Sequence, residues 1–151
     1  NGAGPAADFT ANSFRVDTTL PTIASVTGSS GSANLTVSFS EPVQKSGGGN
    51  LTANQFTFVD NGTVNSHSTS TVSHTIGQPV AIVTLTGNTD SGDFDGTPST
   101  LAAATSTITD MAGNAAAPTV VPLTSPITIT TYVVPTATTT ALFGAGIGFL
   151  W

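Results

Sequence analysis

Apolar and polar residues alternate along most of the chain, with the period of two that is typical of a half-buried β-strand. The clearest case is residues 34–40, where leucine, valine and phenylalanine alternate with threonine and serine. Residues 80–86 are also a predicted strand, with Val80, Ile82 and Thr84 on one face and Ala81, Val83 and Leu85 on the other. No stretch combines a sustained helical period with helix caps, so the pattern predicts a chain built from β-strands.

Turn residues divide this β-rich chain into short segments. Glu41-Pro42 is expected to end the strand at residues 34–40, because proline cannot donate a ladder hydrogen bond. Asn61-Gly62 is the strongest short hairpin signal. We predict strands at residues 20–27, 34–40, 55–60, 63–75, 80–86, 101–108 and 120–134, with one helical turn at residues 51–54. The expected fold is an all-β, Ig-like antiparallel β-sandwich of about seven strands.

The stretch V-D-T-T-L-P-T at residues 16–22 separates an extra N-terminal strand from this domain. In that strand, Phe14 and Val16 share one face, whereas Phe9 points the other way unless a bulge intervenes. A lone strand is not stable in water, so it needs a sheet to join. We therefore divide the chain into an N-terminal strand at residues 1–16, a β-sandwich at residues 17–134, and a C-terminal tail at residues 135–151.

The C-terminal tail is expected to be a linker followed by a strand in which large apolar residues alternate with glycine. Its apolar face would carry Phe143, Ile147, Phe149 and Trp151. No transmembrane span is predicted, because a spanning helix needs roughly 20 apolar residues. A partner must cover an exposed strand of this kind, since it would otherwise aggregate. The tail also faintly resembles the C-terminal sorting tails of some bacterial exported proteins, but it lacks their terminal basic residues.

Charged residues make up only 7% of the chain, and the net charge is −6. Arg15 and Lys45 are the only lysine or arginine residues. Nucleic acids and anionic membranes are bound through clustered basic residues, so neither is an expected partner. The absence of cysteine excludes disulfides and thiolate metal sites. The threonine-rich composition favours an extracellular or cell-surface location, and we expect that any signal peptide before Asn1 has been removed.

Two groups of acidic residues are candidate metal ligands. In an Ig-type sandwich, Asp17, Glu41 and Asp110 would meet at one end of the domain. Their carboxylates could bind Ca²⁺ there and stiffen a junction between domains or subunits. The alternative is that the two aspartates cap turns and that the glutamate is simply solvated.

The second group lies in a loop rich in aspartate and glycine. Asp90, Asp93 and Asp95 suit Ca²⁺, although no bidentate glutamate follows them as in an EF-hand. His67 and His74 are expected to be surface histidines, because no cysteine or third histidine completes a zinc site. No cofactor is required by these patterns, and calcium is the one candidate.

No pattern predicts an enzyme. No serine lies in a G-x-S-x-G nucleophile elbow. Tyr132 and Trp151 are the only tyrosine and tryptophan, which weakens the case for a glycoside hydrolase or a carbohydrate-binding module. The sequons at Asn34, Asn50 and Asn61 are glycosylation candidates in a host that modifies them.

The order of the motifs resembles that of bacterial Ig-like repeats of large surface and secreted proteins. Those repeats tend to contain V-D-T-T-x-P-T, T-V-x-F-S-E-P-V, L-T-x-x-x-F, V-T-L-T-G and D-x-A-G-N. The matching stretches here are residues 16–22, 36–43, 51–56, 83–87 and 110–114. The resemblance covers about residues 16–134 and implies a role in spacing, adhesion or assembly.

In such an array, the segment before V-D-T-T would be the last strand of the preceding repeat. Residues 1–16 would then belong to a fragment of a repeat protein, fold back on their own domain, or donate a strand to a neighbouring copy. We predict an extracellular structural subunit that polymerises into a pilus-like filament or surface assembly by β-strand complementation. Its partners would be other copies of itself, with Phe9, Phe14, Val16 and the apolar C-terminal face at the interface.

Two alternatives stay open. The chain could be a Ca²⁺-dependent adhesin or spacer module of a larger cell-surface repeat protein, attached to a cell surface or matrix. It could also be an accessory spacer beside a catalytic domain.

Overall fold

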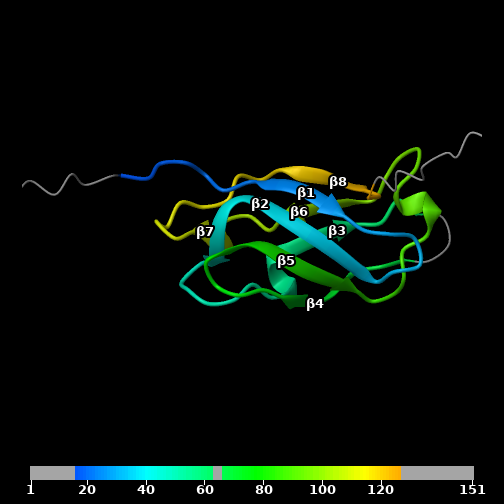
Figure 1. Ribbon diagram of the computed structural model, residues 1–151, viewed down its shortest axis with the longest axis horizontal. Helices are drawn as coiled ribbons and strands as arrows, with labels where there is room; N and C mark the ends of the chain where they lie inside the picture. Colours follow the sequence, from blue (N-terminus) through cyan, green and yellow to red (C-terminus); the bar gives the residue numbers. More distant parts are fainter. Residues whose placement is uncertain (1–15, 63–65, 127–151) are drawn as a thin grey trace, which may run out of the picture.

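The computed structural model describes residues 16–62 and 66–126, which form an all-β domain (Figure 1). The all-β class is therefore confirmed. The strands are β1 (Ile23–Thr27), β2 (Asn34–Lys45), β3 (Phe56–Val59), β4 (Thr69–Ser73), β5 (Gln78–Leu85), β6 (Thr100–Ala103), β7 (Ile108–Asp110) and β8 (Val120–Thr124). Two 3-10 turns, η1 (Ala53–Gln55) and η2 (Ser91–Asp93), are the only helical elements in these two ranges, and neither could span a membrane.

The strands form one curled sheet in the order β3-β6-β8-β1-β2-β5-β4, and β7 pairs with the far end of β2. All pairs are antiparallel except β1 with β8, which are parallel. The two ends of this order, β3 and β4, approach each other, so the sheet is nearly closed. The two-sheet Ig-like sandwich is not confirmed by this arrangement and stays a prediction.

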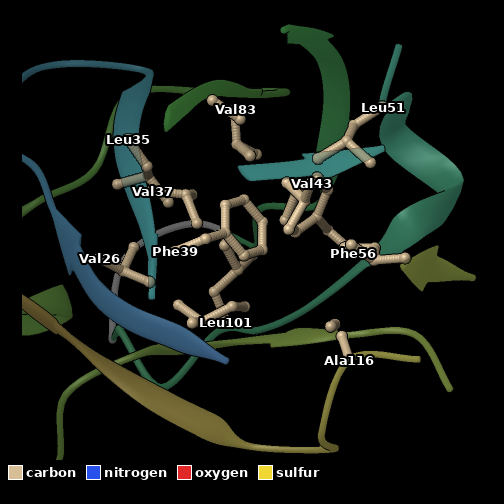
Figure 2. Packing of buried hydrophobic residues seen from close by; sticks show 14 of the residues in the cluster. Val26, Leu35, Val37, Phe39, Val43, Leu51, Phe56, Val83, Leu101 and Ala116 are labelled. Atoms are coloured by element: carbon tan, nitrogen blue, oxygen red, sulfur yellow. The ribbon is translucent and has the colours of Figure 1, made fainter. Parts of the chain in front are cut away.

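Alternating residues of the central strands form the core (Figure 2). In β2, Leu35 and Val37 are fully buried, as the alternation at residues 34–40 predicts. In β5, Ala81, Val83 and Leu85 form the buried face, which the sequence pattern did not distinguish from the opposite face. Burying a side chain the size of valine or leucine contributes about 1.5–3 kcal/mol to stability, so these alternating residues fix the strand register.

The prediction that β2 ends at Pro42 is wrong, because the strand continues to Lys45. Near this proline β2 changes its partner: Phe39 pairs with β1, whereas Val43 pairs with β7. The register with β5 also shifts between Ser38 and Val43. Proline is tolerated here because it lies at a break in the ladder, where its missing N–H removes no hydrogen bond.

Two other strand predictions also need correction. The single strand expected at residues 101–108 is divided into β6 and β7, because the chain turns at Ser106, which has a φ of 59°. Asn61-Gly62 does not connect a paired hairpin, since the described part of β3 pairs with β6 and β4 pairs with β5. The carboxylate of Asp60 instead accepts a hydrogen bond from the N–H of Gly62, which forms an Asx-type turn.

The parallel pair β1 and β8 gives the domain two distinct ends. The described chain begins beside the start of β1 and finishes beyond the end of β8, so its two ends lie at opposite ends of the domain (Figure 1). We call the end with residue 16 and β7 the N-terminal pole, and the end with η2 and residue 126 the C-terminal pole. Every charged side chain of the described ranges lies at one of them: Asp17, Glu41, Lys45 and Asp110 at the N-terminal pole, and Asp60, Asp90, Asp93 and Asp95 at the C-terminal pole.

Candidate functional site

The N-terminal pole gathers three carboxylates from distant parts of the sequence. Asp17 precedes β1, Glu41 lies in β2, and Asp110 ends β7. One oxygen from each lies within 4.8 Å of the others. These three residues were predicted from the sequence to meet at one end of the domain, and the structure brings them together there. Metal binding by them stays a prediction.

Asp110 is held as a carboxylate by the turn that follows it. The residue is 1% exposed. Its Oδ1 accepts a hydrogen bond from the backbone N–H of Asn114 at 2.7 Å, and its Oδ2 accepts one from the Asn114 side chain at 2.6 Å. Burial acts to raise the pKa of Asp110, but hydrogen bonds from Asn114, Gly113 and Ala112 outweigh burial and lower it. The Asn114 Nδ2 also donates to the Asp17 carbonyl at 3.0 Å, which ties the start of the domain to this turn.

Glu41 has the opposite environment. Its Oε1 is buried and has no hydrogen-bond partner among the described residues. Burial raises the pKa of Glu41, and the nearby charges of Asp110 and Asp17 raise it further. Within residues 16–62 and 66–126, none of the three carboxylates forms an ion pair with a basic side chain. Three oxygen ligands without a compensating charge suit a hard cation such as Ca²⁺.

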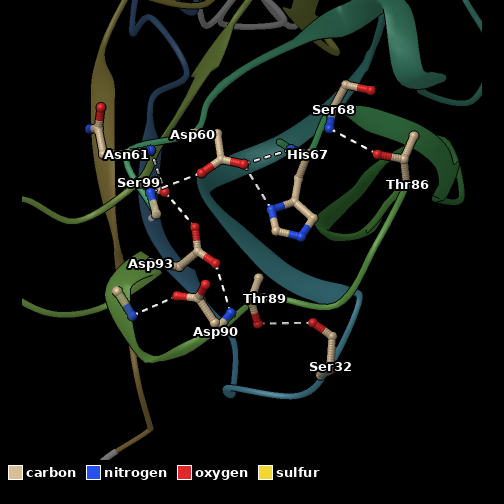
Figure 3. A network of polar contacts seen from close by, with 12 residues as sticks. Ser32, Asp60, Asn61, His67, Ser68, Thr86, Thr89, Asp90, Asp93 and Ser99 are labelled. Carbon is tan, nitrogen blue, oxygen red and sulfur yellow. Dashed lines mark hydrogen bonds and ion pairs between the residues drawn. The ribbon is translucent and has the colours of Figure 1, made fainter. Parts of the chain in front are cut away.

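The C-terminal pole contains a second group, Asp60, His67 and Asp93, whose ligand atoms also lie within 4.8 Å of one another (Figure 3). Asp60 follows β3 and closes the turn toward β4. Its Oδ2 lies 2.8 Å from His67 Nδ1 and accepts the backbone N–H of His67 at 2.6 Å. The imidazole and carboxylate therefore hold the chain on either side of residues 63–65.

Asp93 is completely buried, and both oxygens of its carboxylate accept hydrogen bonds. Its Oδ1 accepts the Ser99 hydroxyl at 2.5 Å, and its Oδ2 accepts the backbone N–H of Asp90 at 2.8 Å. Asp90 in turn accepts the Gly92 N–H at 2.7 Å and caps η2. This pole is thus a hydrogen-bonded network that fixes the loop between β5 and β6 (Figure 3).

The loop does not direct the carboxylates of Asp90, Asp93 and Asp95, the second predicted Ca²⁺ site, to one point. Asp93 points inward to Ser99 and lies close to Asp60, whereas Asp95 is exposed. The reason is the capping of η2, in which the first and last aspartates of the turn bind each other's backbone. The spacing of the aspartates in the sequence does not reveal that Asp90 and Asp93 cap this turn.

The prediction that the histidines lie on the surface is wrong, since His67 and His74 are each only 8% exposed. His74 Nδ1 accepts the backbone N–H of Leu51 at 3.2 Å, and its Nε2 lies 3.0 Å from the carbonyl oxygen of Gln78. These contacts define one tautomer, with the proton on Nε2. Both histidines lie in polar stretches of the sequence, so their burial was not predicted. Asp60, seven residues before His67 and on the other side of the Asn-Gly turn, was a signal in the sequence for a carboxylate partner of His67.

The three sequon asparagines are all exposed. Asn34 accepts a hydrogen bond from the Thr84 hydroxyl, Asn50 accepts one from the backbone N–H of Ile76, and Asn61 donates one to the Pro98 carbonyl. Glycosylation of these residues stays a prediction.

Of the predicted interface residues, only Val16 lies within the described ranges, and it is 81% exposed. Phe9, Phe14, Phe143, Ile147, Phe149 and Trp151 lie outside them. The predicted N-terminal strand and C-terminal tail therefore also lie outside the described residues, apart from residue 16.

No protein-family model and no curated protein matches the sequence. Three solved structures are similar in fold: the S-layer protein SbsC, the N-terminal part of the bacterial S-layer protein SbsC, and domains 1–6 of the surface layer protein SbsC. The TM-scores are 0.51, 0.51 and 0.52, with 24%, 23% and 24% sequence identity over 70%, 71% and 71% of this chain. The chain spans only 14%, 24% and 14% of those proteins, so the similarity concerns a domain.

Proposed function

We propose that this chain is a structural subunit of a cell-surface or extracellular assembly, in which successive domains join end to end. The observation that carries the proposal is the parallel pairing of β1 with β8. Because of that pairing, the described chain begins at the N-terminal pole and finishes at the C-terminal pole. A domain connected in this way passes directly to a neighbour at either end, which suits a spacer or a repeating unit.

Two further observations support an architectural role. The fold is similar to domains of a protein described as a bacterial S-layer protein. Between the poles, the sides of the sheet carry no charged side chain in the described ranges, because the charged residues of β2 and β7 lie at the N-terminal pole. Uncharged sides lower the cost of burying surface in an assembly, since no charge has to be desolvated. The proposal assigns no catalytic activity to the chain.

The finer proposal concerns how copies are joined. Residues 1–16 of one copy add as a strand to the sheet of the next copy and bury Phe9, Phe14 and Val16. The tail with Phe143, Ile147, Phe149 and Trp151 packs at the same interface or at another one. The exposure of Val16 supports this, because a valine with so little contact to its own domain is free to lie against a neighbour.

The test is deletion of residues 1–14 from the full chain. We expect the truncated protein to keep the thermal unfolding of the domain and to lose assembly, measured by size-exclusion chromatography and negative-stain electron microscopy. Deletion of residues 1–7 is the matched control, because it keeps all three apolar residues and should preserve assembly. Filaments of unchanged length after the longer deletion would contradict strand complementation.

A second candidate function is a calcium-stiffened spacer or adhesin module. The specific observation in its favour is the buried Glu41 Oε1, which has no described partner and lies beside two other carboxylates. A cation there would brace the junction that Asn114 already ties to Asp17. This candidate predicts a monomer whose melting temperature rises with Ca²⁺.

A further inference from the structure

We infer that the outer edge of β4 is the acceptor for the donated strand, which lies antiparallel to β4 with Arg15 at the C-terminal pole of the acceptor. The inference rests on the proposed strand complementation and adds where, and in which direction, the strand binds. Four features of the structure lead to it: a free sheet edge, a hollow, the direction of the strands, and the charge of the pole.

The sheet order ends at β3 and β4, so each of these strands has an edge without a hydrogen-bonded partner strand in the described ranges, and the two edges approach each other beside η1. A hollow of about 330 Å³ lies along the β4 edge. It is bounded on one side by η1 and on the other by consecutive residues of β4, and it contains no charged side chain. The lining residues are Thr52, Ala53, Asn54, Ser70, Thr71 and Val72. An extended peptide binds such an edge through its backbone, and adjoining hollows receive its side chains.

The direction of the strands favours β4 over β3. In an end-to-end assembly, the next copy lies beyond the C-terminal pole of the acceptor, so a donor that leads into it must run toward that pole. β3 runs toward the C-terminal pole, because it is antiparallel to β6, which is antiparallel to β8. β4 runs toward the N-terminal pole. It is antiparallel to β5, which runs in the same direction as β1 because both are antiparallel to β2. The donor is therefore antiparallel to β4, and antiparallel pairs are slightly more stable per residue than parallel ones.

The charge of the acceptor matches the end of the donor. Arg15 is the only arginine of the chain and directly precedes the exposed Val16. In the antiparallel arrangement it arrives at the C-terminal pole, where every described charged side chain is an aspartate. Asp95 is exposed there. A guanidinium group forms charge-assisted hydrogen bonds with such a carboxylate.

The first residue of β4 also has an unsatisfied polar group. The hydroxyl of Thr69, the first residue of the strand, is buried and has no described partner. β4 begins at the C-terminal pole, so we assign the register that sets Ser13 of the donor beside Ser70 and Thr10 beside Ser73, which puts Arg15 just beyond the start of β4 at that pole. The donor end near Arg15 then lies beside Thr69.

Engineered disulfides test this arrangement directly, because the full chain has no cysteine of its own. The double variants Ser13→Cys with Ser70→Cys, and Thr10→Cys with Ser73→Cys, should form covalent oligomers on oxidation, seen on non-reducing gels. Ser13→Cys with Ser73→Cys is the mismatched control. Those positions would be about 10 Å apart along the strand, whereas bridged cysteines need Cα atoms within about 7 Å. Covalent oligomers should be lost in this control.

The alternative edge is tested by Ser13→Cys with Thr57→Cys, since Thr57 lies on β3. Cross-linking of this pair in place of the β4 pairs would overturn the inference and leave strand complementation intact. If no pair cross-links, while deletion of residues 1–14 abolishes assembly, the acceptor is elsewhere and the inference is again overturned. If that deletion leaves assembly unchanged, the proposed function itself fails.

A charge exchange tests the position of Arg15 separately. Arg15→Glu should abolish assembly without changing the melting temperature of the monomer, and Asp95→Arg in the same chain should restore it. Assembly of the Arg15→Glu variant at the wild-type level would overturn the assignment of Arg15 to this pole. Failure of the second substitution to restore assembly would overturn the pairing with Asp95.

Discussion

Both poles of the domain contain buried carboxylate oxygens, but the hydrogen bonding of these oxygens differs between the poles. At the C-terminal pole, Asp93 is fully buried and both of its oxygens accept hydrogen bonds. At the N-terminal pole, Glu41 has a buried oxygen without a described partner, and the charges of Asp17 and Asp110 act against its ionisation. Asp93 is therefore satisfied within the domain, whereas the buried oxygen of Glu41 has no described partner that would stabilise its charge.

The difference lies in where the hydrogen-bond donors come from. At the C-terminal pole the donors are close in sequence: Asp90 lies three residues before Asp93, and Ser99 lies six residues after it. At the N-terminal pole the three carboxylates come from separate segments, and only Asp110 has its own turn of donors. A short loop can supply the hydrogen-bond donors for its own aspartate. Carboxylates that the fold brings together from distant segments need donors or positive charge from elsewhere.

The largest expected effect comes from removing the two hydrogen bonds that the Asp93 carboxylate accepts at the C-terminal pole. Asp93→Ala leaves the Ser99 hydroxyl and the Asp90 N–H buried without their acceptor, so we expect a loss of about 3 kcal/mol in the free energy of unfolding. Urea denaturation measures it. Asp95→Ala is the matched control in the same loop, and it should change stability by less than about 0.5 kcal/mol because the residue is exposed. Equal losses of stability from the two substitutions would show that the hydrogen bonds of the buried Asp93 do not stabilise the domain more than the exposed Asp95 does.

A smaller loss is expected at the N-terminal pole from Asn114→Ala. The substitution removes the side-chain hydrogen bonds to Asp110 and to the Asp17 carbonyl, at a cost of about 2 kcal/mol at pH 7. Because the folded pKa of Asp110 is lowered, its contribution is present above the ordinary value of 3.8 and is lost as pH falls through the folded value. The variant should therefore lose less stability than the wild type between pH 5 and about pH 2, measured by denaturation at each pH.

Calcium should stabilise the domain through the N-terminal pole by about 1.4 kcal/mol when its concentration is ten times the dissociation constant. Differential scanning calorimetry with and without Ca²⁺ measures the gain. Glu41→Gln is the control, because it keeps the shape of the side chain and removes its charge, and it should reduce the gain. An equal gain in the variant would place the cation elsewhere, and no gain in the wild type would contradict the calcium candidate.

The smallest effect is expected from Glu41→Gln without divalent cations. The folded pKa of Glu41 is raised above 4.5, so its favourable contribution is present below that value and is lost as pH rises through the folded pKa. At neutral pH the substitution should increase the free energy of unfolding by less than about 1 kcal/mol, since it removes the repulsion. The gain should disappear at a pH low enough to protonate Glu41. A destabilised variant at neutral pH would show that Glu41 has an unrecognised partner.

The sequence predicted those parts of the domain in which one face of a strand meets the core. The burial of Leu35 and Val37 follows from alternation alone, because burial acts on every second residue. The meeting of Asp17, Glu41 and Asp110 was expected from the strand arrangement of an Ig-type sandwich, which itself stays a prediction. The burial of alternate residues depends on periodicity, which the sequence expresses directly.

The predictions that failed depend on individual contacts. Pro42 lies inside β2 because β7 replaces β1 as its partner, and β7 was not foreseen as a separate strand. His67 is buried because Asp60 accepts hydrogen bonds from its backbone and lies beside its ring. Asp93 points inward because Ser99 lies opposite. Each case needs a pairing between segments that local composition does not specify.

The parallel pairing of β1 with β8 also determines how the domain responds to a pulling force. If neighbours pull on its two ends, β1 is drawn toward the N-terminal pole and β8 toward the C-terminal pole, so the strands slide past each other. The contacts between them include the hydrogen bonds from Gly28 N–H to the Thr124 carbonyl and from the Thr124 hydroxyl to the Val26 carbonyl. Under such shear they must break together, whereas terminal strands arranged antiparallel could unzip one bond at a time. The same connection that carries the chain from pole to pole therefore also resists its mechanical extension.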